Sequence, residues 1–273
     1  MALADRSRAA EELKDILSSF DSLGVAFSGG VDSSLLLAAA VDSLGRERVI
    51  ALTAVSELVP ERDRLGANEV ATLLGVRHLT VRFPILENAL VAANTPDRCY
   101  HCKRAIFTAL LEEAKRQGVG TLVHGATIDD ANDFRPGQKA ADELGVRAPL
   151  CEAGLGKAEI RDLARARGLP NWDQPSMACL ASRLPYGTPL TAAALRRVER
   201  AEEFLRERFG LRQVRVRDHM PVARIECEEA DIPRLLEAGP RAEVERALRD
   251  LGWRYTALDL RGFRTGSMNE ALT

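Results

Sequence analysis

The sequence has few lysines and no long apolar run. Its 38 basic residues are 33 Arg and 5 Lys, and 40 acidic residues leave a net charge of -2, which gives no overall attraction to nucleic acid or to an anionic membrane. The many arginines and alanines indicate a compositional bias, so a surface arginine alone says little about function. The longest apolar run, residues 35–41, covers seven residues, whereas a membrane-spanning helix needs about 20. The sequence therefore predicts neither a membrane span nor a nucleic-acid partner.

The first 20 residues are charged and repeat with a helical period, without the apolar segment and small-residue cleavage site of a signal peptide. We therefore expect a cytoplasmic protein. The cysteines are Cys99, Cys102, Cys151, Cys179 and Cys227. Five is an odd number and too few for a disulfide framework, so in a reducing compartment these residues should be thiols, metal ligands or redox groups.

Apolar runs alternate with helical repeats along the first two thirds of the chain. Expected strands cover residues 23–27, 48–55, 76–83 and 121–125, and expected helices cover residues 13–20, 33–44, 60–74, 100–117 and 156–167. Strands that alternate with helices imply right-handed crossovers and a parallel sheet. The predicted fold class is therefore α/β, a parallel sheet flanked by helices.

The pattern changes at residues 185–189, where turn-forming residues predict a domain boundary. We place a first domain, which carries most of the cysteines, at residues 1–187 and a second at residues 188–273. The second shows an expected helix at 195–209, expected strands at 213–217, 222–226 and 254–260, and two short helices. This order predicts a small α+β domain.

A glycine loop, FSGGVDSS at residues 27–34, stands between the first expected strand and the next helix. Paired glycines let the backbone approach an anion, the helix N-terminus supplies partial positive charge, and the serines add hydroxyl donors. Asp32 would repel a bare phosphate, so its useful role is to hold a divalent cation that bridges phosphates. A plain Gly-Gly turn with Ser33 as helix N-cap is the simpler alternative.

The loop lacks the Gly-Lys-Ser/Thr of a Walker loop and the Gly-x-Gly-x-x-Gly of a dinucleotide fold, so neither a P-loop kinase nor hydride transfer is supported. Ser-Gly-Gly-x-Asp-Ser after a first strand resembles the PP-loop of the ATP pyrophosphatase superfamily. Those enzymes cleave ATP between its α- and β-phosphates to adenylylate a substrate. The superfamily includes amide ligases, tRNA thiolases and other sulfur transferases, and this loop alone does not choose among them.

Cys99 and Cys102 form a C-x-x-C at the start of an expected helix, where the helix dipole and the next two basic residues favour the thiolate. A lone C-x-x-C serves as half of a zinc site, as a redox pair, or as part of an iron–sulfur site. The sequence has no second C-x-x-C to complete a four-cysteine zinc site. Cys151 and Cys227 lie at the ends of expected strands and are interpreted as buried, inert thiols.

Cys179 lies in a loop-like stretch instead, and loops carry chemistry more often than packing. At this point the chain is similar to the LarE family. The similarity rests on FSGGVDSS, on HGATIDDANDFRPGQKA at 124–140, on PSMACLASRLPYGTPLT at 175–191, on VRVRDHMPVARIE at 214–226 and on GFRTGSMNEAL at 262–272. These segments occur in the family's order over nearly the whole chain.

The resemblance implies an ATP-dependent sulfur transferase in the biosynthesis of the nickel-pincer nucleotide cofactor. It would adenylylate the carboxylates of pyridinium-3,5-biscarboxylic acid mononucleotide and convert them to thiocarboxylates, with ATP and Mg²⁺ as cofactors. The second domain would bind the substrate phosphate and support a homo-oligomer. The source of the sulfur stays open.

The resemblance also assigns residues by position. Ser28, Gly29, Gly30, Ser33 and Ser34 would bind the ATP phosphates, and Asp32 would hold Mg²⁺. Arg135 would lie near the substrate, Ser182 and Arg183 beside the sulfur donor Cys179, and Glu202 close to it. Arg215, Arg217 and Glu226 would form an anion site. Arg215 and Arg217 are two residues apart on an expected strand and so share a face, although a pair of solvated arginines is the alternative.

Family members with the donor cysteine alone give up its sulfur and are left with dehydroalanine. This chain instead resembles the three-cysteine subgroup, in which Cys99, Cys102 and Cys179 would hold a 4Fe-4S cluster whose extra sulfide is the donor. A tRNA thiolase is the enzymatic alternative, but it needs a basic surface, and residues 188–273 carry 16 Arg against 15 acids. The hypothesis of an amide ligase gives no reason for the cysteines. The hypothesis of an ATP-sensing module without enzymatic activity gives no reason for Asp32 and the serines.

Overall fold

The structure is a computed structural model that describes residues 3–131, 136–175, 177–264 and 267–268. The chain forms two compact units. Unit 1 comprises residues 1–85 and 97–177, and unit 2 comprises residues 86–96 and 178–273. In the described part of the chain, no helix is long and apolar enough to cross a membrane.

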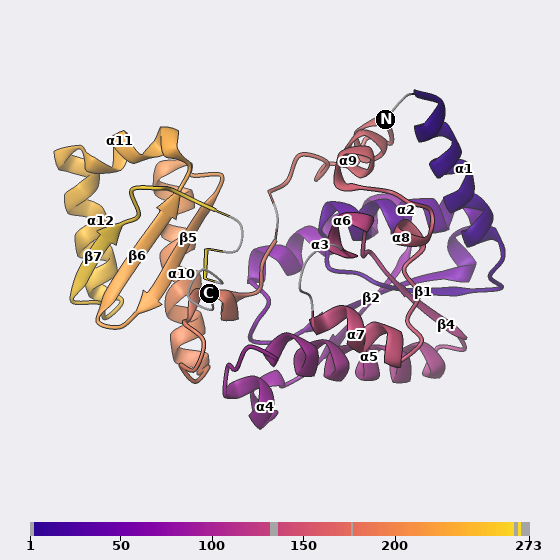
Figure 1. The fold of residues 1–273 in the computed structure, drawn as a ribbon, viewed down its shortest axis with the longest axis horizontal. Coiled ribbons are helices and arrows are strands. Elements are labelled where there is room, and N and C mark those ends of the chain that lie inside the picture. The colour runs from indigo at the N-terminus through magenta and orange to yellow at the C-terminus, as the bar shows by residue number, and fades with distance from the viewer. Residues whose placement is uncertain (1–2, 132–135, 176, 265–266, 269–273) are drawn as a thin grey trace. The chain divides into compact units, whose positions relative to one another are not determined.

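Unit 1 is built on a parallel sheet with the strand order β3-β2-β1-β4 (Figure 1). Its strands are β1 (Leu23–Ala26), β2 (Val49–Val55), β3 (Arg77–Arg82) and β4 (Thr121–His124). Its helices are α1 (Leu3–Ser18), α2 (Val31–Leu44), α3 (Glu61–Leu74), α5 (Arg98–Arg116), α6 (Ile128–Ala131), α7 (Pro136–Glu143), α8 (Pro149–Glu152) and α9 (Lys157–Ala166), with the 3-10 turn η1 (Arg46–Arg48). The α/β prediction is confirmed.

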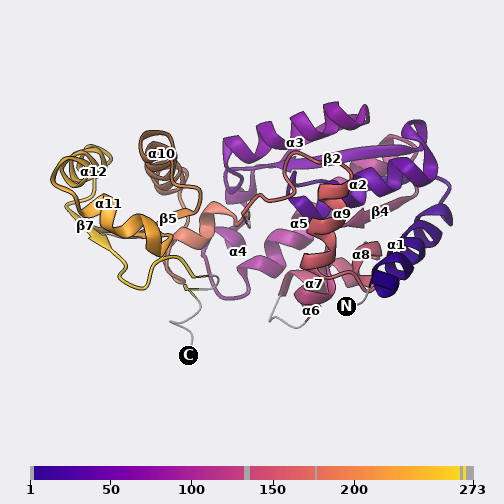
Figure 2. The same ribbon diagram turned by 90° about the horizontal axis from the view of Figure 1, so that it is seen from above.

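Both faces of this sheet are buried. Since successive strand residues point to opposite sides, they belong to two different apolar clusters. In β2, Val49 and Ala51 belong to one apolar cluster, while Ile50 and Leu52 belong to the other. The first cluster is completed by α1, α2, α3, α8 and α9, and the second by α5 and α7. Helices α5 and α7 pack against each other (Figure 2).

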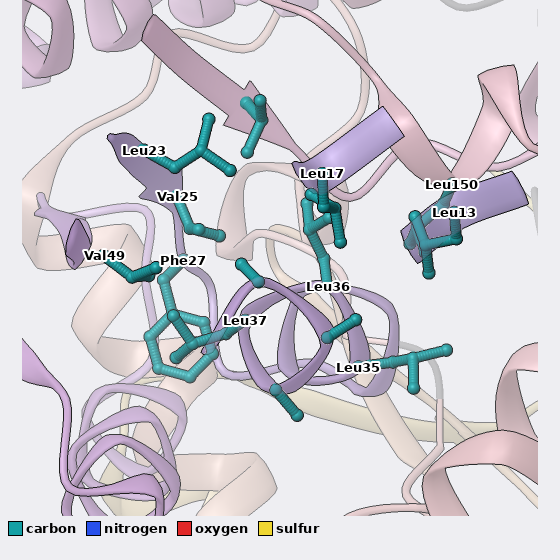
Figure 3. Close-up of a cluster of buried hydrophobic side chains, with 14 of the residues drawn as sticks. Leu13, Leu17, Leu23, Val25, Phe27, Leu35, Leu36, Leu37, Val49 and Leu150 are labelled. Carbon is teal, nitrogen blue, oxygen red and sulfur yellow. The ribbon is translucent and has the colours of Figure 1, made fainter. Parts of the chain in front are cut away.

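Helix α2 lies at the centre of the first cluster (Figure 3). Its consecutive residues Leu35, Leu36 and Leu37 are all fully buried, and a helix that is apolar on every side must be enclosed by other elements. The N-terminus of α2 is thereby fixed at the carboxyl edge of the sheet, where β1 and β4 also end. Open parallel sheets bind their ligands at this edge.

Unit 2 contains a mixed sheet with the order β5-β6-β7, antiparallel between β5 and β6 and parallel between β6 and β7. Its strands are β5 (Val214–His219), β6 (Val222–Cys227) and β7 (Tyr255–Leu258). Its helices are α4 (Ala89–Ala92), α10 (Ala192–Phe209), α11 (Ile232–Leu236) and α12 (Ala238–Asp250), with the 3-10 turns η3 (Leu180–Arg183) and η4 (Glu229–Asp231). The turn η2 (Ile85–Glu87) lies at the division of the units.

The units divide at Met177 and Ala178, ten residues before the expected boundary. Residues after the division bond within unit 2, where Asn94 Nδ2 donates to the carbonyls of Pro185 and Thr188 at 2.8 and 2.9 Å. The sequence pattern also does not predict the short helices α4, α6, α7 and α8, because four to eight residues show too little of a helical period. Cys151 consequently lies in α8 rather than at a strand end.

Candidate functional site

The glycine loop, residues 27–34, follows β1 at the carboxyl edge of the unit 1 sheet, and its last four residues form the first turn of α2. Gly29 has a φ of 80°, in the left-handed region that favours glycine. A Cβ at Gly29 would lie 2.8 Å from the Cα of Ala67 on α3. Both the backbone conformation and the contact with α3 therefore require glycine at this position.

Three carbonyls of the glycine loop accept hydrogen bonds from inside unit 1. The donors are Thr53 Oγ1 to Phe27 at 2.6 Å, Asn171 Nδ2 to Gly29 at 2.7 Å, and both Ser34 N–H and Ser33 Oγ to Gly30 at 2.9 and 3.0 Å. Thr53 Oγ1 also lies 2.8 Å from His78 Nε2. Because the Thr53 proton goes to a carbonyl, the His78 nitrogen is the donor in that pair.

The loop serines differ in their surroundings. Ser28 is exposed, and its Oγ lies 3.1 Å from Ser33 Oγ and accepts from the Gly30 N–H at 3.3 Å. Ser33 and Ser34 are buried, and Ser34 Oγ accepts from Asn171 at 2.9 Å. The N-cap of α2 is Gly30, so the alternative with Ser33 as the N-cap is wrong.

Asp32 lies in the first turn of α2 with a partly exposed side chain. The partial positive charge of a helix N-terminus stabilises a carboxylate there. Mg²⁺ prefers oxygen ligands and is commonly held by one or two carboxylates together with phosphate oxygens and waters. The chemistry of Asp32 therefore fits a magnesium ligand.

Strand β4 brings a second segment to the same edge. A Cβ at Gly125 would lie 2.9 Å from the backbone N of Ser33, so the chain after β4 runs directly against the start of α2. The preceding residue, His124, is 9% exposed, and its ring meets the Phe107 ring edge-on at 5.3 Å. Burial and the charge of Lys103 lower the pKa of His124 to about 4, so its imidazole is neutral at neutral pH.

Sequence reasoning gave no role to Thr53, Asn171 or His124, although all three lie at or beside the loop. His124 carried a signal, because a histidine and a glycine end the expected strand at 121–125. Thr53 and Asn171 carried none, since one is an ordinary strand residue and the other a single asparagine in a turn.

The C-x-x-C lies at the start of α5, as the sequence predicts. Cys99 and Cys102 are partly exposed, and Arg98 donates to Cys99 Sγ at 3.6 Å. A Cβ at Gly137, on α7, would lie 2.8 Å from the Lys103 side chain, so the segment after residue 135 packs against this turn. Arg135 itself lies outside the described residues.

All five cysteines lie in the described residues and none forms a disulfide. Burial raises the pKa of Cys227 to about 11, and burial also raises that of Cys151. A raised pKa disfavours the thiolate that metals bind and that attacks electrophiles. This supports the interpretation of Cys151 and Cys227 as inert thiols, although Cys151 is only half-buried.

Within the described ranges, no three His, Cys, Asp or Glu side chains gather as a metal site. Cys99 and Cys102 belong to unit 1 and Cys179 to unit 2. The two thiols on α5 are suited to iron by ligand type and by their spacing of one helical turn. They supply two of the three ligands that the cluster hypothesis requires.

Cys179 directly precedes η3 in unit 2. The backbone carbonyls of this loop accept hydrogen bonds from two nearby side chains. The carbonyl of Cys179 accepts from Ser182 Oγ at 2.9 Å and from Arg183 Nη1 at 3.0 Å. The same nitrogen donates to the Ala178 carbonyl at 2.8 Å. Ser182 and Arg183 thus lie beside Cys179, where the resemblance places them.

Arg183 and Glu202 form a buried, two-pronged ion pair, with N–O distances of 2.7 and 2.9 Å. Glu202 also accepts from Arg206 at 2.7 Å and from the Val216 N–H of the edge strand β5 at 3.1 Å. Burial alone would raise the pKa of Glu202, but the arginines outweigh it and lower the pKa to about 2. The carboxylate therefore links the cysteine loop to β5.

Arg215 and Arg217 are 3% and 4% exposed, so the alternative of two solvated arginines is wrong. Arg217 donates to Glu226 at 2.6 Å, to Ser267 at 2.8 Å and to the Ser182 carbonyl at 2.8 Å. Burial and the charges of neighbouring arginines lower the pKa of Arg215 to about 9, against the opposing charge of Glu202.

We call this set of charged residues the arginine network. Its cations are Arg183, Arg206, Arg215, Arg217, Arg224 and Arg264, and its carboxylates are Glu202, Glu226 and Asp259. In the part of the chain that the structure describes, these ion pairs share three carboxylates among several largely buried guanidinium groups. Guanidinium groups that gather in this way are suited to the binding of an anion.

Comparisons with known proteins agree with these observations. The sequence model of the asparagine synthase family matches residues 7–123. A pyridinium-3,5-bisthiocarboxylic acid mononucleotide synthase from Lactiplantibacillus plantarum is 42% identical over 249 residues, which cover 91% of this chain and 89% of that protein. An uncharacterised protein of Synechocystis sp. is 38% identical and covers 96% of this chain and 97% of its own length. A tRNA-specific 2-thiouridylase from Frankia alni is 31% identical over 55% of this chain and 52% of its own length.

The free energy of unfolding should decrease as the pH is lowered, because His124 is buried in its neutral form. Its pKa drops from 6.5 to about 4 on folding, so between these values the unfolded chain binds a proton that the folded chain refuses. The loss reaches about 3 kcal/mol near pH 4. Urea unfolding should show stability falling more steeply from pH 6.5 to 4.5 in the wild type than in His124→Leu, in which the lowered pKa values of His78 and His219 still act. Parallel curves would contradict this, because every titrating group other than His124 is common to both proteins.

Proposed function

Because the chain belongs to the LarE family of ATP-dependent sulfur transferases, we propose that it converts the carboxylates of pyridinium-3,5-biscarboxylic acid mononucleotide into thiocarboxylates. The similar protein of Lactiplantibacillus plantarum is named as the synthase of the bisthiocarboxylic acid mononucleotide. The observation that carries the proposal is the glycine loop, whose carbonyls are bound from inside the unit and whose sequence lacks a lysine for γ-phosphoryl transfer. The product would serve the nickel-pincer nucleotide cofactor.

In the first step, a substrate carboxylate oxygen attacks the α-phosphorus of ATP. The bond from that phosphorus to the oxygen bridging to the β-phosphorus breaks, and pyrophosphate leaves with the electron pair. The groups that bind the phosphates are Ser28, Gly29, Gly30, Ser33 and Ser34, through hydroxyls and N–H groups at the start of α2. Asp32 holds Mg²⁺, which offsets the phosphate charge.

In the second step, a sulfur nucleophile attacks the acyl carbon, and AMP leaves with the electrons of the carbon–oxygen bond. Ser182 and Arg183 fix the loop that presents Cys179, and Glu202 holds Arg183 in place. Arg135 would contact the substrate in this proposal. The arginine network of unit 2 would bind the substrate phosphate.

The phosphate role of the network is supported by the gathering of guanidinium groups there. Arg215 is buried close to Arg183, Arg206 and Arg217, and this burial and their charges lower its pKa, while Glu202 opposes them. Arg217 is already oriented by Glu226 and Ser267, so its guanidinium needs little reorganisation on binding. We therefore place the phosphate of the mononucleotide at Arg215 and Arg217, with Glu226 as the carboxylate that orients Arg217.

We also propose that Cys99, Cys102 and Cys179 hold a 4Fe-4S cluster, which when bound would supply an extra sulfide on its open iron as the sulfur donor. In the alternative, Cys179 Sγ itself attacks the acyl carbon. The thioester then loses the cysteine Cα proton and its Cβ–S bond breaks, which releases the thiocarboxylate and leaves dehydroalanine.

The tRNA thiolase alternative receives less support. The matching thiouridylase covers about half of the chain, and three arginines of unit 2 that RNA phosphates would need are buried in ion pairs or among other cations, namely Arg183, Arg215 and Arg217. Binding to RNA phosphates requires exposed cations. A cytoplasmic location stays a prediction from the N-terminal sequence, and a homo-oligomer stays one that rests on the resemblance.

ATP should be cleaved to AMP and pyrophosphate only when the biscarboxylate mononucleotide is present. Asp32→Ala should abolish this cleavage, because it removes the anchor of the magnesium ion. Asp42→Ala is the matched control, since Asp42 is an exposed residue of the same helix that pairs with Arg167. Nucleotide products separated by ion-exchange chromatography decide the outcome, and ADP in place of AMP would refute the mechanism.

The double variant Arg215→Gln/Arg217→Gln should raise the KM for the mononucleotide by roughly tenfold to a hundredfold, the value of one or two charged hydrogen bonds. Its KM for ATP should not change. The dephosphorylated nucleoside should react equally with variant and wild type, because it lacks the group that the arginines bind. Arg208→Gln controls for loss of a surface ion pair. An equal rise in KM for the mononucleotide and for the nucleoside would contradict the assignment of the phosphate to Arg215 and Arg217.

If the cluster forms, Cys99→Ala or Cys102→Ala should lose the brown colour and multiple-turnover catalysis together, while Cys151→Ala keeps both. Iron and sulfide content, the visible spectrum and the mass of Cys179 after anaerobic turnover with added sulfide provide the measurement. An intact Cys179 after many turnovers supports the cluster. Dehydroalanine at Cys179 in proportion to product establishes the sacrificial route instead.

A further inference from the structure

We propose that Asn171 is a positioning residue of the glycine loop, which orients the peptide between Gly29 and Gly30 for phosphate binding. The proposal rests on the proposed function in one respect, since it takes residues 27–30 to be the phosphate site. Asn171 stands in the turn after α9 and reaches the loop with both hydrogens of its amide, to the Gly29 carbonyl at 2.7 Å and to Ser34 Oγ at 2.9 Å.

The orientation of the Asn171 amide follows from its partner. A backbone carbonyl only accepts hydrogen bonds, so the group that faces Gly29 O must be the NH₂ and not the oxygen. The remaining oxygen, Asn171 Oδ1, is buried and has no hydrogen-bond partner among the described residues. Burying an acceptor without a hydrogen-bond partner is unfavourable, so a contribution to stability does not by itself account for an asparagine at this position.

The turn that carries Asn171 is fixed to α9. Arg161 donates to the carbonyls of Trp172 and Gln174 at 3.0 and 2.9 Å. The guanidinium of Arg165 lies 4.9 Å from the centre of the Trp172 ring, a distance at which a cation is attracted to the ring face. The position of Asn171 is therefore fixed by contacts with α9 that do not involve the glycine loop.

The peptide that Asn171 holds is the one with the least intrinsic restraint. Its orientation depends on ψ of Gly29 and φ of Gly30, and neither residue has a Cβ to restrict rotation. In a trans peptide the N–H points opposite to the C=O, so drawing Gly29 O inward turns the Gly30 N–H outward, to the side of Ser28 Oγ.

The neighbouring peptides are held in the same way. Thr53 holds Phe27 O and Ser33 holds Gly30 O, which directs the N–H groups of Ser28 and Val31 outward by the same rule. Backbone N–H groups that converge in this manner bind anions. Without Asn171 the central peptide is held only by the 3.3 Å hydrogen bond from the Gly30 N–H to Ser28 Oγ, and if it turns over it presents an oxygen to the phosphates.

Binding of α,β-methylene-ATP with Mg²⁺ tests the proposal without turnover. Calorimetry should show affinity about tenfold weaker for Asn171→Ala, the worth of two neutral hydrogen bonds. Asn171→Asp should be weaker still, because an oxygen of the same size would face the Gly29 carbonyl. Asn68→Ala, at an exposed asparagine of α3, is the matched control and should bind as the wild type does.

Adenosine, which lacks phosphates, separates positioning from general damage. It should bind equally to the wild type and to both Asn171 variants. If either folded variant binds the ATP analogue within twofold of the wild type, or loses adenosine and the analogue alike, the proposal is overturned; Asn171→Asp keeps the test available if Asn171→Ala does not fold. A wild type that binds the analogue but transfers no sulfur would refute the proposed function and leave this inference standing.

Discussion

The conformation of the glycine loop depends on the direction of three peptide carbonyls at the carboxyl edge of a parallel sheet. Those of Phe27, Gly29 and Gly30 accept hydrogen bonds from inside unit 1, which turns the N–H groups of the following residues to the opposite side; in our proposal these N–H groups face the phosphates. The donors come from β2, from the turn after α9 and from α2 itself. The conformation of the loop is thus a property of the whole unit, and the two glycines only make it possible.

The stability of unit 2 depends on a different electrostatic condition, because several of its arginines are buried. Each carboxylate of its network is shared among several guanidinium groups, as Glu202 is between Arg183 and Arg206. Desolvating a charge is costly unless a partner of opposite sign is close and well oriented. The pairs offset that cost for Arg183, Arg206 and Arg217, and in the function proposed above the substrate phosphate adds a further anion to the network.

The sequence predicts the four parallel strands and the long helices because each is long enough to show a period or an apolar run. The glycine loop, Asp32 and the C-x-x-C are also visible, since their chemistry is local. Asn171 is not, because it meets Ser34 across 137 residues of chain and a single asparagine has no pattern. The division at Met177 is hidden for the same reason, because it depends on contacts such as that between Arg183 and Glu202 that form only on folding.

Arg183 and Ser182 reach Cys179 through its carbonyl oxygen, an atom that every amino acid possesses. The shape of the cysteine loop is therefore insensitive to what stands on the Cβ of residue 179. A dehydroalanine at this position would keep the same carbonyl oxygen, although its Cα would be planar. Under the two routes proposed above, these carbonyl contacts would therefore serve both a consumable and a renewable sulfur source, and the two routes would differ in the thiols at two positions of α5.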